Sequence, residues 1–315
     1  MDSPAPLDPA ALALLASLSE AGSLSAAARA AGVSQPALTK QLARLERQLG
    51  VPLFSRSIRG VVPTDYGQAL LPRARIVRAQ LAQAAEALAQ LRGQREGQVC
   101  VALSHLATVQ LVPGVLPLFR ERWPGVRLRL VAPTFAQLMT GLREGLPDMA
   151  VAQLPGEDPG PEFVVRPLLE TTLAAVVRPG HPLARVTTLS ALAEARVEWV
   201  LPSEDSATGG ALRDAFRRAR LPLPRCTVTC ETLTGVEAIV RATDLVAAMP
   251  AEVHEARCAA SGLFRLPLAQ APRGRTLALV RWADNLLTPA AANLAELFVA
   301  QAHALARRQR KSAAG

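Results

Sequence analysis

Residues 23–64 constrain this chain more than any other stretch, because two short helical patterns there are separated by one glycine. The first pattern places small apolar residues three or four positions apart, which gives a short helix one narrow apolar face: Leu24, Ala27, Ala28 and Ala31. Gly32 then permits the sharp turn that a helix-turn-helix needs. The pattern predicts a helix-turn-helix at about residues 23–42.

The second helix has clear start and stop signals. Ser34 is the expected N-cap, Pro36 falls in the first turn, and Gly50 suits a left-handed C-cap. An apolar stripe at helical spacing is expected to face inward: Leu38, Leu42, Leu45 and Leu49. The remaining face carries amide, hydroxyl and cationic groups: Gln35, Thr39, Lys40, Arg44 and Arg47. Such groups on one helical face are those that contact base edges and phosphates.

A basic hairpin is expected after this helix. Residues 51–54 and 61–62 can pair as short strands around a tip that holds Arg56 and Arg59. From residue 23 to residue 60, six basic residues and one acid, Glu46, give a net charge of +5. This charge density predicts binding to a polyanion. Alanine-rich helix pairs with arginine faces also occur in soluble bundles, but the ordered set of turn, cap, stripe and hairpin favours nucleic acid.

A long helix is expected at residues 65–92, with Thr64 as its N-cap. Its apolar residues alternate spacings of four and three: Leu70, Ala74, Val77, Leu81, Ala84, Leu88 and Leu91. A seam this narrow favours a helical partner, and packing against the chain's own globular body is the alternative. The polar stretch at residues 93–97, with a glycine at each end, is expected to be a hinge.

From residue 98 onward, short strand-like segments alternate with helix-like ones. The strand-like segments are residues 99–103, 126–131, 148–153, 171–177, 197–201, 226–231, 244–249 and 276–282. This alternation predicts an α/β sandwich with largely parallel sheets, in one large lobe or two small ones. The expected fold class is therefore α+β overall: a winged helix-turn-helix, a long linker helix and a C-terminal α/β domain.

The run AARAAGVSQPALTKQLARLERQLGVPLFSRSIRG resembles the winged helix-turn-helix of LysR-type transcriptional regulators, almost continuously. LVPGVLPLFRERWPGVRLRLV and LREGLPDMAVA resemble, less closely, the effector-binding domain of that family, which has a two-lobed fold like type II periplasmic binding proteins. The resemblance implies double-stranded DNA, a small organic effector and a second copy of the chain as partners, in a dimer or tetramer. RNA polymerase is a further partner that the resemblance allows. Pro63 is a departure, since the family usually has leucine there.

By this resemblance the DNA-contacting residues are Ser34, Gln35, Pro36, Thr39, Lys40 and Arg44 on the recognition helix, with Arg56 and Arg59 on the wing. The implied domains are a winged domain at 7–64, a linker helix at 65–92, a hinge at 93–97, a first lobe at 98–170 and 273–305, a second lobe at 171–272 and a basic tail at 306–315.

The effector is expected between the lobes. Ligands of parallel α/β folds meet the loops at the carboxyl ends of strands, where helix N-termini present free N–H groups. The residues at these junctions are the predicted effector-binding set: Ser104, His105, Thr134, Gln153, Ser203 and Thr234. The resemblance places effector contacts at Ser104 and Thr134. Hydroxyl-bearing helix starts suit a small organic anion, although each hydroxyl can equally be an ordinary cap. No cofactor and no metal are expected.

Other classes find less support. The four histidines lack metalloprotease spacing, and the chain has no G-x-S-x-G, Walker or G-x-G-x-x-G motif. The alternative is a motif-less α/β enzyme, or a solute-binding protein with an accessory basic domain. No apolar run is long enough to span a membrane and no secretory signal opens the chain, so a cytoplasmic protein without a membrane partner is expected.

The four cysteines contain no C-x-x-C pair. Cys226 and Cys230 lie four residues apart in an alternating stretch, so on a regular strand both would point to the same side. Idle thiols and a redox pair both remain open. The net charge of +9 favours an anionic partner.

Overall fold

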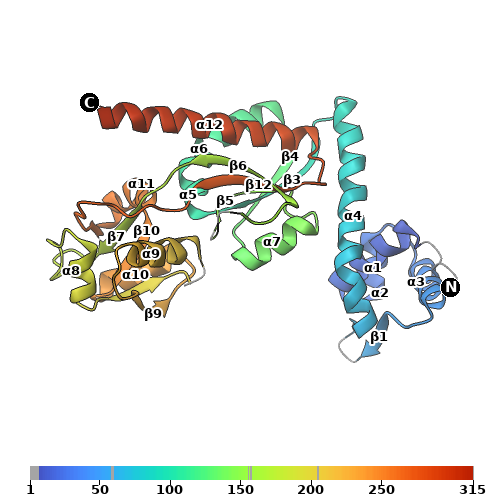
Figure 1. The fold of residues 1–315 in the computed structure, drawn as a ribbon. Coiled ribbons are helices and arrows are strands. Elements are labelled where there is room, and N and C mark those ends of the chain that lie inside the picture. Colours follow the sequence, from blue (N-terminus) through green and yellow to red (C-terminus); the bar gives the residue numbers. More distant parts are fainter. Residues whose placement is uncertain (1–6, 58–59, 155, 157, 204–205, 315) are drawn as a thin grey trace. The chain divides into compact units, whose positions relative to one another are not determined.

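The structure is a computed structural model that describes residues 7–57, 60–154, 156, 158–203 and 206–314 (Figure 1). By backbone contacts the chain divides into two compact units. One comprises Met1–Gln94 with Thr140–Leu146, and the other comprises Arg95–Met139 with Pro147–Gly315. The expected α+β class is confirmed.

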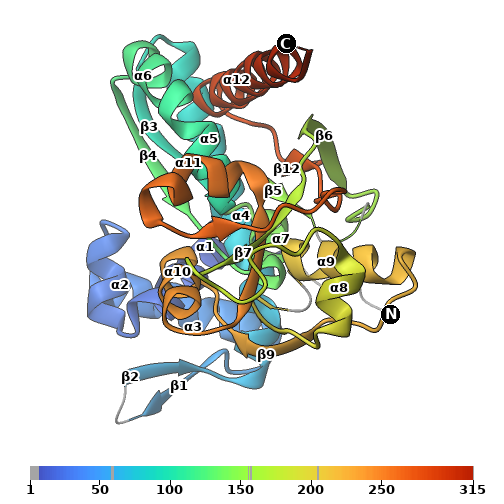
Figure 2. The ribbon, with the colours of Figure 1, turned by 90° about the vertical axis from the view of Figure 1, so that its left-hand side faces the viewer.

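The N-terminal unit is a winged helix-turn-helix followed by a long helix. Its elements are α1 (Pro9–Ala21), α2 (Leu24–Ala30), α3 (Gln35–Leu49), β1 (Phe54–Ser57), β2 (Gly60–Pro63) and α4 (Asp65–Leu91). β1 and β2 pair antiparallel as the wing, which projects as a hairpin in Figure 2. The predicted N-caps Ser34 and Thr64 are confirmed, as is Gly50 as a left-handed C-cap, with φ of 71°. Gly32 takes the positive φ, 66°, that the turn requires.

Two apolar clusters hold this unit together. Leu38 and Leu45 of the α3 stripe are fully buried, whereas Leu42 and Leu49 are half-buried against the same clusters. Ala31 is exposed, so its assignment to the inner face of the first helix was wrong. A bidentate pair joins α1 to α4, with Arg78 Nη1 2.8 Å from Glu20 Oε2. The hydrogen bond from Arg78 holds the pKa of Glu20 below its ordinary value.

The first lobe of the larger unit has a five-stranded sheet in the order β4-β3-β5-β12-β6. Its strands are β3 (Glu96–Leu103), β4 (Gly125–Val131), β5 (Met149–Gln153), β6 (Phe163–Leu169) and β12 (Leu277–Trp282). Its helices are α5 (His105–Gln110), α6 (Val112–Arg122), α7 (Phe135–Arg143) and α12 (Pro289–Ala314), and α6 packs beside α12 on one side of the sheet (Figure 1). β3 takes up Glu96 and Gly97, so the hinge expected at residues 93–97 is shorter.

The second lobe has a five-stranded sheet in the order β11-β7-β10-β8-β9. Its strands are β7 (Leu173–Val177), β8 (Glu198–Leu201), β9 (Arg225–Thr229), β10 (Val246–Pro250) and β11 (Phe264–Arg265). Its helices are α8 (Leu189–Glu194), α9 (Ala207–Arg218), α10 (Leu233–Ala242) and α11 (Ala251–Ser261). Parallel pairing links β10, β8 and β9, but β7 pairs antiparallel with β10 and β11, as β12 does with β5 and β6. The sheets are therefore parallel only in part.

Two crossover segments connect the lobes, and they lie side by side. Thr172 and Arg273 form an antiparallel bridge. On either side of this bridge, Leu173 N donates to Pro272 O at 2.7 Å and Gly274 N donates to Thr171 O at 2.9 Å. A Cβ atom at Gly274 would come within 2.2 Å of Thr171 Oγ1, so only glycine allows this approach without a shift.

Cys226 and Cys230 do not share one environment. The pairing of β8 with β9 shifts between Trp199 and Val200, which face Cys226 and Val228, so one extra residue is inserted on β9. Cys226 packs with Trp199 in the second-lobe cluster, whereas Cys230 packs against the larger cluster that contains β3 and β5. The expectation that both thiols point to one side was wrong, because the bulge breaks the alternation. The Cys258 side chain lies outside the described part.

Among the described helices, none is both long and apolar enough to cross a membrane.

Candidate nucleic-acid interface and effector pocket

The polar face of α3 is at the surface of its unit. Gln35, Pro36, Lys40 and Arg44 are exposed, as is the cap Ser34, and Thr39 is half-buried. No described residue forms an ion pair with Lys40 or Arg44. The apolar stripe occupies the opposite face, so packing within the unit fixes which side of α3 is presented.

Local hydrogen bonds arrange the first turn of α3. Ser34 Oγ accepts from Ala37 N at 3.4 Å, and Ser25 Oγ of α2 donates to Gln35 Oε1 at 2.8 Å. Thr39 Oγ1 donates to Gln35 O at 2.9 Å. The Gln35 side chain is thereby oriented with its amide N–H groups left to donate. Lys40 and Arg44 supply positive charge one and two turns further along.

Glu46, the single acid of the basic segment, supports the wing. Its Oε1 accepts from Leu53 N at 2.7 Å and from Phe54 N at 3.2 Å, which ties the last turns of α3 to the start of β1. The sequence reasoning counted Glu46 only as a charge. Glu46 lies between Leu45, which is buried, and Leu49, which is half-buried. This position in the sequence was the available signal that its side chain turns inward.

The wing also meets the turn after α1. Val61 N donates to Gly22 O at 3.1 Å, and a Cβ atom at Gly60 would lie 2.5 Å from that same oxygen. Arg56 lies in β1 opposite Val61. The side chain of Arg56 and the whole of Arg59 lie outside the described residues, so both wing contacts remain predictions.

The larger unit contains a pocket of about 520 Å³ between its lobes. Five of the six predicted effector residues line it: Ser104, His105, Thr134, Gln153 and Ser203. Further polar residues that the sequence reasoning missed are Ser206, Thr208 and Glu231. Thr234 is not among the described lining residues, and the cap of α10 is Thr232, two residues before it. A role for Thr234 in effector binding stays a prediction.

Three helices begin in the pocket wall. Ser104 Oγ accepts from Ala107 N at the start of α5, at 3.3 Å. At α7, Thr134 Oγ1 accepts from Gln137 N at 3.4 Å while Gln137 Oε1 accepts from Thr134 N at 3.1 Å, a reciprocal capping box. Both hydroxyls are therefore caps, and each still has its hydrogen to donate.

The third helix, α9, is capped three residues later than expected. Ser206 Oγ accepts from Gly209 N at 3.0 Å and donates to Ser203 O at 2.6 Å. Ser203 therefore holds the cap in place instead of being the cap. Helix N-termini carry partial positive charge, and no lysine or arginine is among the described lining residues of the pocket.

His105 and Glu231 add chemistry at the pocket wall. Desolvation lowers the pKa of the His105 imidazole, and the charge of Arg257 lowers it further. The neutral ring is thereby favoured, with one nitrogen to donate and one to accept. Glu231 is the one acid among the described lining residues.

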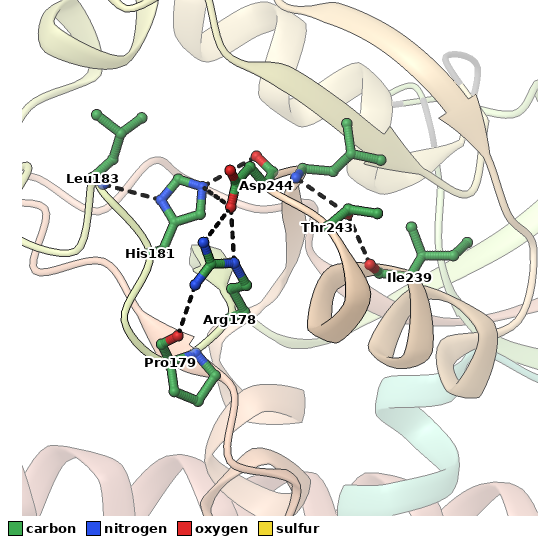
Figure 3. Close-up of polar contacts among 8 residues, drawn as sticks. Arg178, Pro179, His181, Leu183, Ile239, Thr243 and Asp244 are labelled. Carbon is green, nitrogen blue, oxygen red and sulfur yellow. Dashed lines mark hydrogen bonds and ion pairs between the residues drawn. The ribbon is translucent and has the colours of Figure 1, made fainter.

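A histidine–carboxylate pair lies elsewhere in the second lobe (Figure 3). The His181 side chain is 3% exposed, and its Nε2 is 4.0 Å from Asp244 Oδ1. Nδ1 accepts from Leu183 N at 3.0 Å, so Nε2 carries the hydrogen and donates to Asp244 O at 3.1 Å. Arg178 Nε donates to Asp244 Oδ1 at 2.8 Å. Backbone groups occupy both ring nitrogens, so the cluster fastens the loop after β7 to the start of β10.

Comparison with known proteins gives consistent matches. Residues 9–68 match the family model for the bacterial regulatory helix-turn-helix protein of the lysR family, and residues 92–303 match the LysR substrate binding domain. The HTH-type transcriptional regulator GalR of Pseudomonas putida is 31% identical over 284 residues, which cover 90% of this chain and 71% of that protein.

Solved structures share the fold. ArgP from Mycobacterium tuberculosis has a TM-score of 0.70 at 24% identity, covering 94% of this chain and 98% of that one. Full-length CbnR, solved in complex with its target DNA, has a TM-score of 0.67 at 22% identity, covering 94% of this chain and 100% of that one.

Proposed function

The chain belongs to the LysR family of DNA-binding transcriptional regulators, and from that premise we propose which of its residues bind DNA and effector. The observation that carries the DNA assignment is the exposed face of α3, where Lys40 and Arg44 stand opposite a buried leucine stripe. We place this face in the major groove, with Gln35 and Thr39 near base edges and Ser34 and Pro36 at the phosphates. Arg56 and Arg59 of the wing are proposed to contact the adjacent backbone or minor groove.

Binding to a duplex of mixed sequence tests this assignment without knowledge of the operator. Replacing Arg44 with Ala removes one cation from the α3 face, so we expect weaker binding and a salt slope shallower by about 1. Arg185→Ala is the matched control, because Arg185 is exposed in the second lobe, outside the winged domain. Equal affinity and equal salt slope for the parent and Arg44→Ala would remove Arg44 from the interface.

A second copy of the chain is the proposed partner for the far half of α4. Leu71 and Ala74 are buried within the unit, but Leu81, Leu88 and Leu91 are 49%, 58% and 74% exposed. These three leucines continue the apolar seam, so they offer a narrow stripe that a second α4 can cover. A dimer would present two recognition helices to two half-sites of an operator.

The proposed effector is a small organic anion in the pocket between the lobes. The N-termini of α5, α7 and α9 meet there, and Ser104 and Thr134 each keep a hydroxyl hydrogen to donate. An effector that binds one arrangement of the lobes better than another shifts the population of the oligomer toward that arrangement. A thermal-shift screen of small carboxylic acids on the full chain tests this, because a ligand of the native state raises the melting temperature.

Regulation of transcription places the protein with chromosomal DNA, and we propose the cytoplasm as its location. Contact with RNA polymerase at the promoter is a further proposal, which rests on promoter binding alone. The enzyme and solute-binding alternatives are not favoured by the relatives, which are named as transcriptional regulators.

A further inference from the structure

A separate pocket of about 200 Å³ lies in the second lobe, at the end of the sheet where β8 and β9 begin. Trp199 near the start of β8 and Arg225 at the start of β9 line it. The effector pocket is lined by Ser203 and Glu231, which follow these two strands, and the two pockets share no described lining residue. At about 3.3 Å per residue, strands roughly 10 Å long or more separate them. We call this cavity the tryptophan pocket.

Apolar side chains form most of the tryptophan pocket. Trp199 and Phe216 are each 1% exposed and meet edge to face, with their ring centroids 6.1 Å apart. Leu192 and Ala193 of α8 and Val197 after it complete this apolar surface. A dry apolar cavity of about 150 Å³ can hold benzene, so the tryptophan pocket has room for one ring or a short alkyl chain.

The loop before β9 keeps the tryptophan pocket open. Pro222 and Pro224 fix their own φ angles, and each restricts the residue before it to extended backbone. Leu223, between them, lines the pocket but is 51% exposed, so its side chain leaves the cavity unfilled. The wall is therefore in place before a ligand arrives, and apolar surface remains for a ligand to cover.

Two arginines line the tryptophan pocket, and they differ in their partners. Arg225 Nη1 is 3.2 Å from Glu198 Oε1. Arg196 is exposed, and its side chain forms no ion pair or hydrogen bond with a residue that the structure describes. The structure describes the chain without a gap on both sides of every lining residue, from 191 to 200 and from 215 to 226. One guanidinium group at the pocket is therefore free to bind an anion.

The turn after α8 fixes the backbone of Arg196. Arg196 N donates to Ala193 O at 3.1 Å and Val197 N donates to Leu192 O at 3.5 Å. Arg196 is left-handed, with φ of 51°, at the helix-end position where glycine is usual. Arg220 takes the same conformation after α9, with φ of 55°, but does not line the pocket. Arg220 is therefore a matched control for Arg196.

We propose that the tryptophan pocket binds a small monocarboxylate that has an apolar ring or chain. The apolar part covers Trp199 and Leu223, and the carboxylate meets the free guanidinium group of Arg196. A guanidinium fork matches the two oxygens of a carboxylate, which a neutral molecule of the same shape lacks. A second anionic group on the ligand finds Arg225 already paired with Glu198.

One helix reaches both pockets. Ala207 and Thr208, at the start of α9, line the effector pocket, and Phe216, near its end, lines the tryptophan pocket. A ligand in the tryptophan pocket therefore packs against the helix whose first turn forms part of the effector pocket. The inference does not depend on which effector the proposed function assigns.

Fluorine NMR of the full chain labelled with fluorotryptophan tests the proposal. The chain has three tryptophans, and replacing Trp123 and Trp282 in turn by Phe assigns the third resonance to Trp199. The probes are phenylacetate and phenylethanol, which share a ring and differ in charge. We expect phenylacetate to shift the Trp199 resonance saturably, with a Kd about 2- to 5-fold below that of phenylethanol, the range for an ion pair at an exposed site.

Variants locate the site. Arg196→Gln should make the two probes bind alike, because it removes the cation that distinguishes them. Arg220→Gln carries the same change of charge at the same kind of helix end and should bind as the parent does. Ala193→Leu places a larger side chain in the pocket wall and should abolish the response to both probes, in a protein that circular dichroism shows to be folded. Thr134→Val alters the effector pocket and should leave the titration unchanged.

Four results would overturn the proposal: no shift of the Trp199 resonance with phenylacetate, equal affinity of the parent for the two probes, an equal loss in Arg220→Gln and Arg196→Gln, or a full response in Ala193→Leu. A response that is lost in Thr134→Val would also overturn it, because the probe would then bind in the effector pocket.

Discussion

Two substitutions of Glu46 change the charge of the basic segment, residues 23–60, by the same amount but are expected to affect the position of the wing differently. Glu46→Ala and Glu46→Gln each raise the net charge of residues 23–60 by one, so electrostatic attraction to DNA increases equally in both. They differ in structure. The glutamine keeps an oxygen that can accept from Leu53 N or Phe54 N, whereas alanine leaves both donors without the carboxylate that holds them at 2.7 and 3.2 Å.

Hydrogen bonds to a charged group contribute about 1.5–3 kcal/mol, so in Glu46→Ala the amide hydrogens of Leu53 and Phe54 should exchange about 10- to 100-fold faster than in the parent. Glu46→Gln should show a smaller change. Hydrogen exchange measured by mass spectrometry at fixed pH reports on these two amides directly.

Binding to a mixed-sequence duplex completes the test. We expect Glu46→Gln to bind at least as tightly as the parent, and Glu46→Ala to bind more weakly than Glu46→Gln because its wing is no longer tied to α3. If the two variants exchange and bind alike, the carboxylate does not hold the wing and the reasoning is wrong.

Four other changes give distinct outcomes. Leu38→Ala, at a fully buried position, should cost about 2–5 kcal/mol in urea denaturation followed by far-UV circular dichroism, and a cost below 1 kcal/mol would contradict the assigned core. Joint replacement of Leu81 and Leu88 by Glu should give monomers in light scattering, and persistent dimers would move the interface elsewhere. Thr134→Val should reduce the thermal shift given by an effector and leave DNA binding intact, and an unchanged shift would exclude Thr134 from the pocket. Burial raises the pKa of Glu252, whose Oε2 lacks a hydrogen-bond partner in the described part. A raised carboxyl pKa means that stability is lost as pH rises through it, so Glu252→Gln should be the more stable protein at neutral pH, by about 1 kcal/mol, and the difference should disappear in acid.

Local rules were enough to predict the winged domain. The N-caps Ser34 and Thr64 can be recognised by their hydroxyl side chains, and the C-cap Gly50 by its lack of a side chain. The leucine stripe follows from residue spacing within one helix. These features need no knowledge of distant residues. Glu46 was missed because its partners lie seven and eight residues away, in a different element.

Prediction failed where pairing between strands decides the structure. β6 was not expected, and Pro167 within it argues against a strand; the structure places β6 at the edge of its sheet, where proline is tolerated. The bulge on β9 arises in its pairing with β8, and no residue pattern around Cys226 indicates it. The helix-start rule found Ser104 and Thr134, but it took Ser203 for the hydroxyl at the start of α9, three residues before the cap Ser206.

The ion pair between Asp214 and Arg275 could not be predicted from local patterns. Asp214 and Arg275 are 61 residues apart, and they meet only because the chain returns from the second lobe beside its outgoing segment. Counting charges along the sequence predicts a positive net charge for the chain, but it does not show that these two residues meet.

The paired crossovers make the second lobe an insertion with adjoining ends. Thr171 and Gly274 are already joined by a backbone hydrogen bond of 2.9 Å, so a short turn between them would close the first lobe with β12 still in register. Exchange of the second lobe therefore needs only two adjoining cut points, and such an exchange offers a route by which one DNA-reading scaffold acquires a different chemical signal.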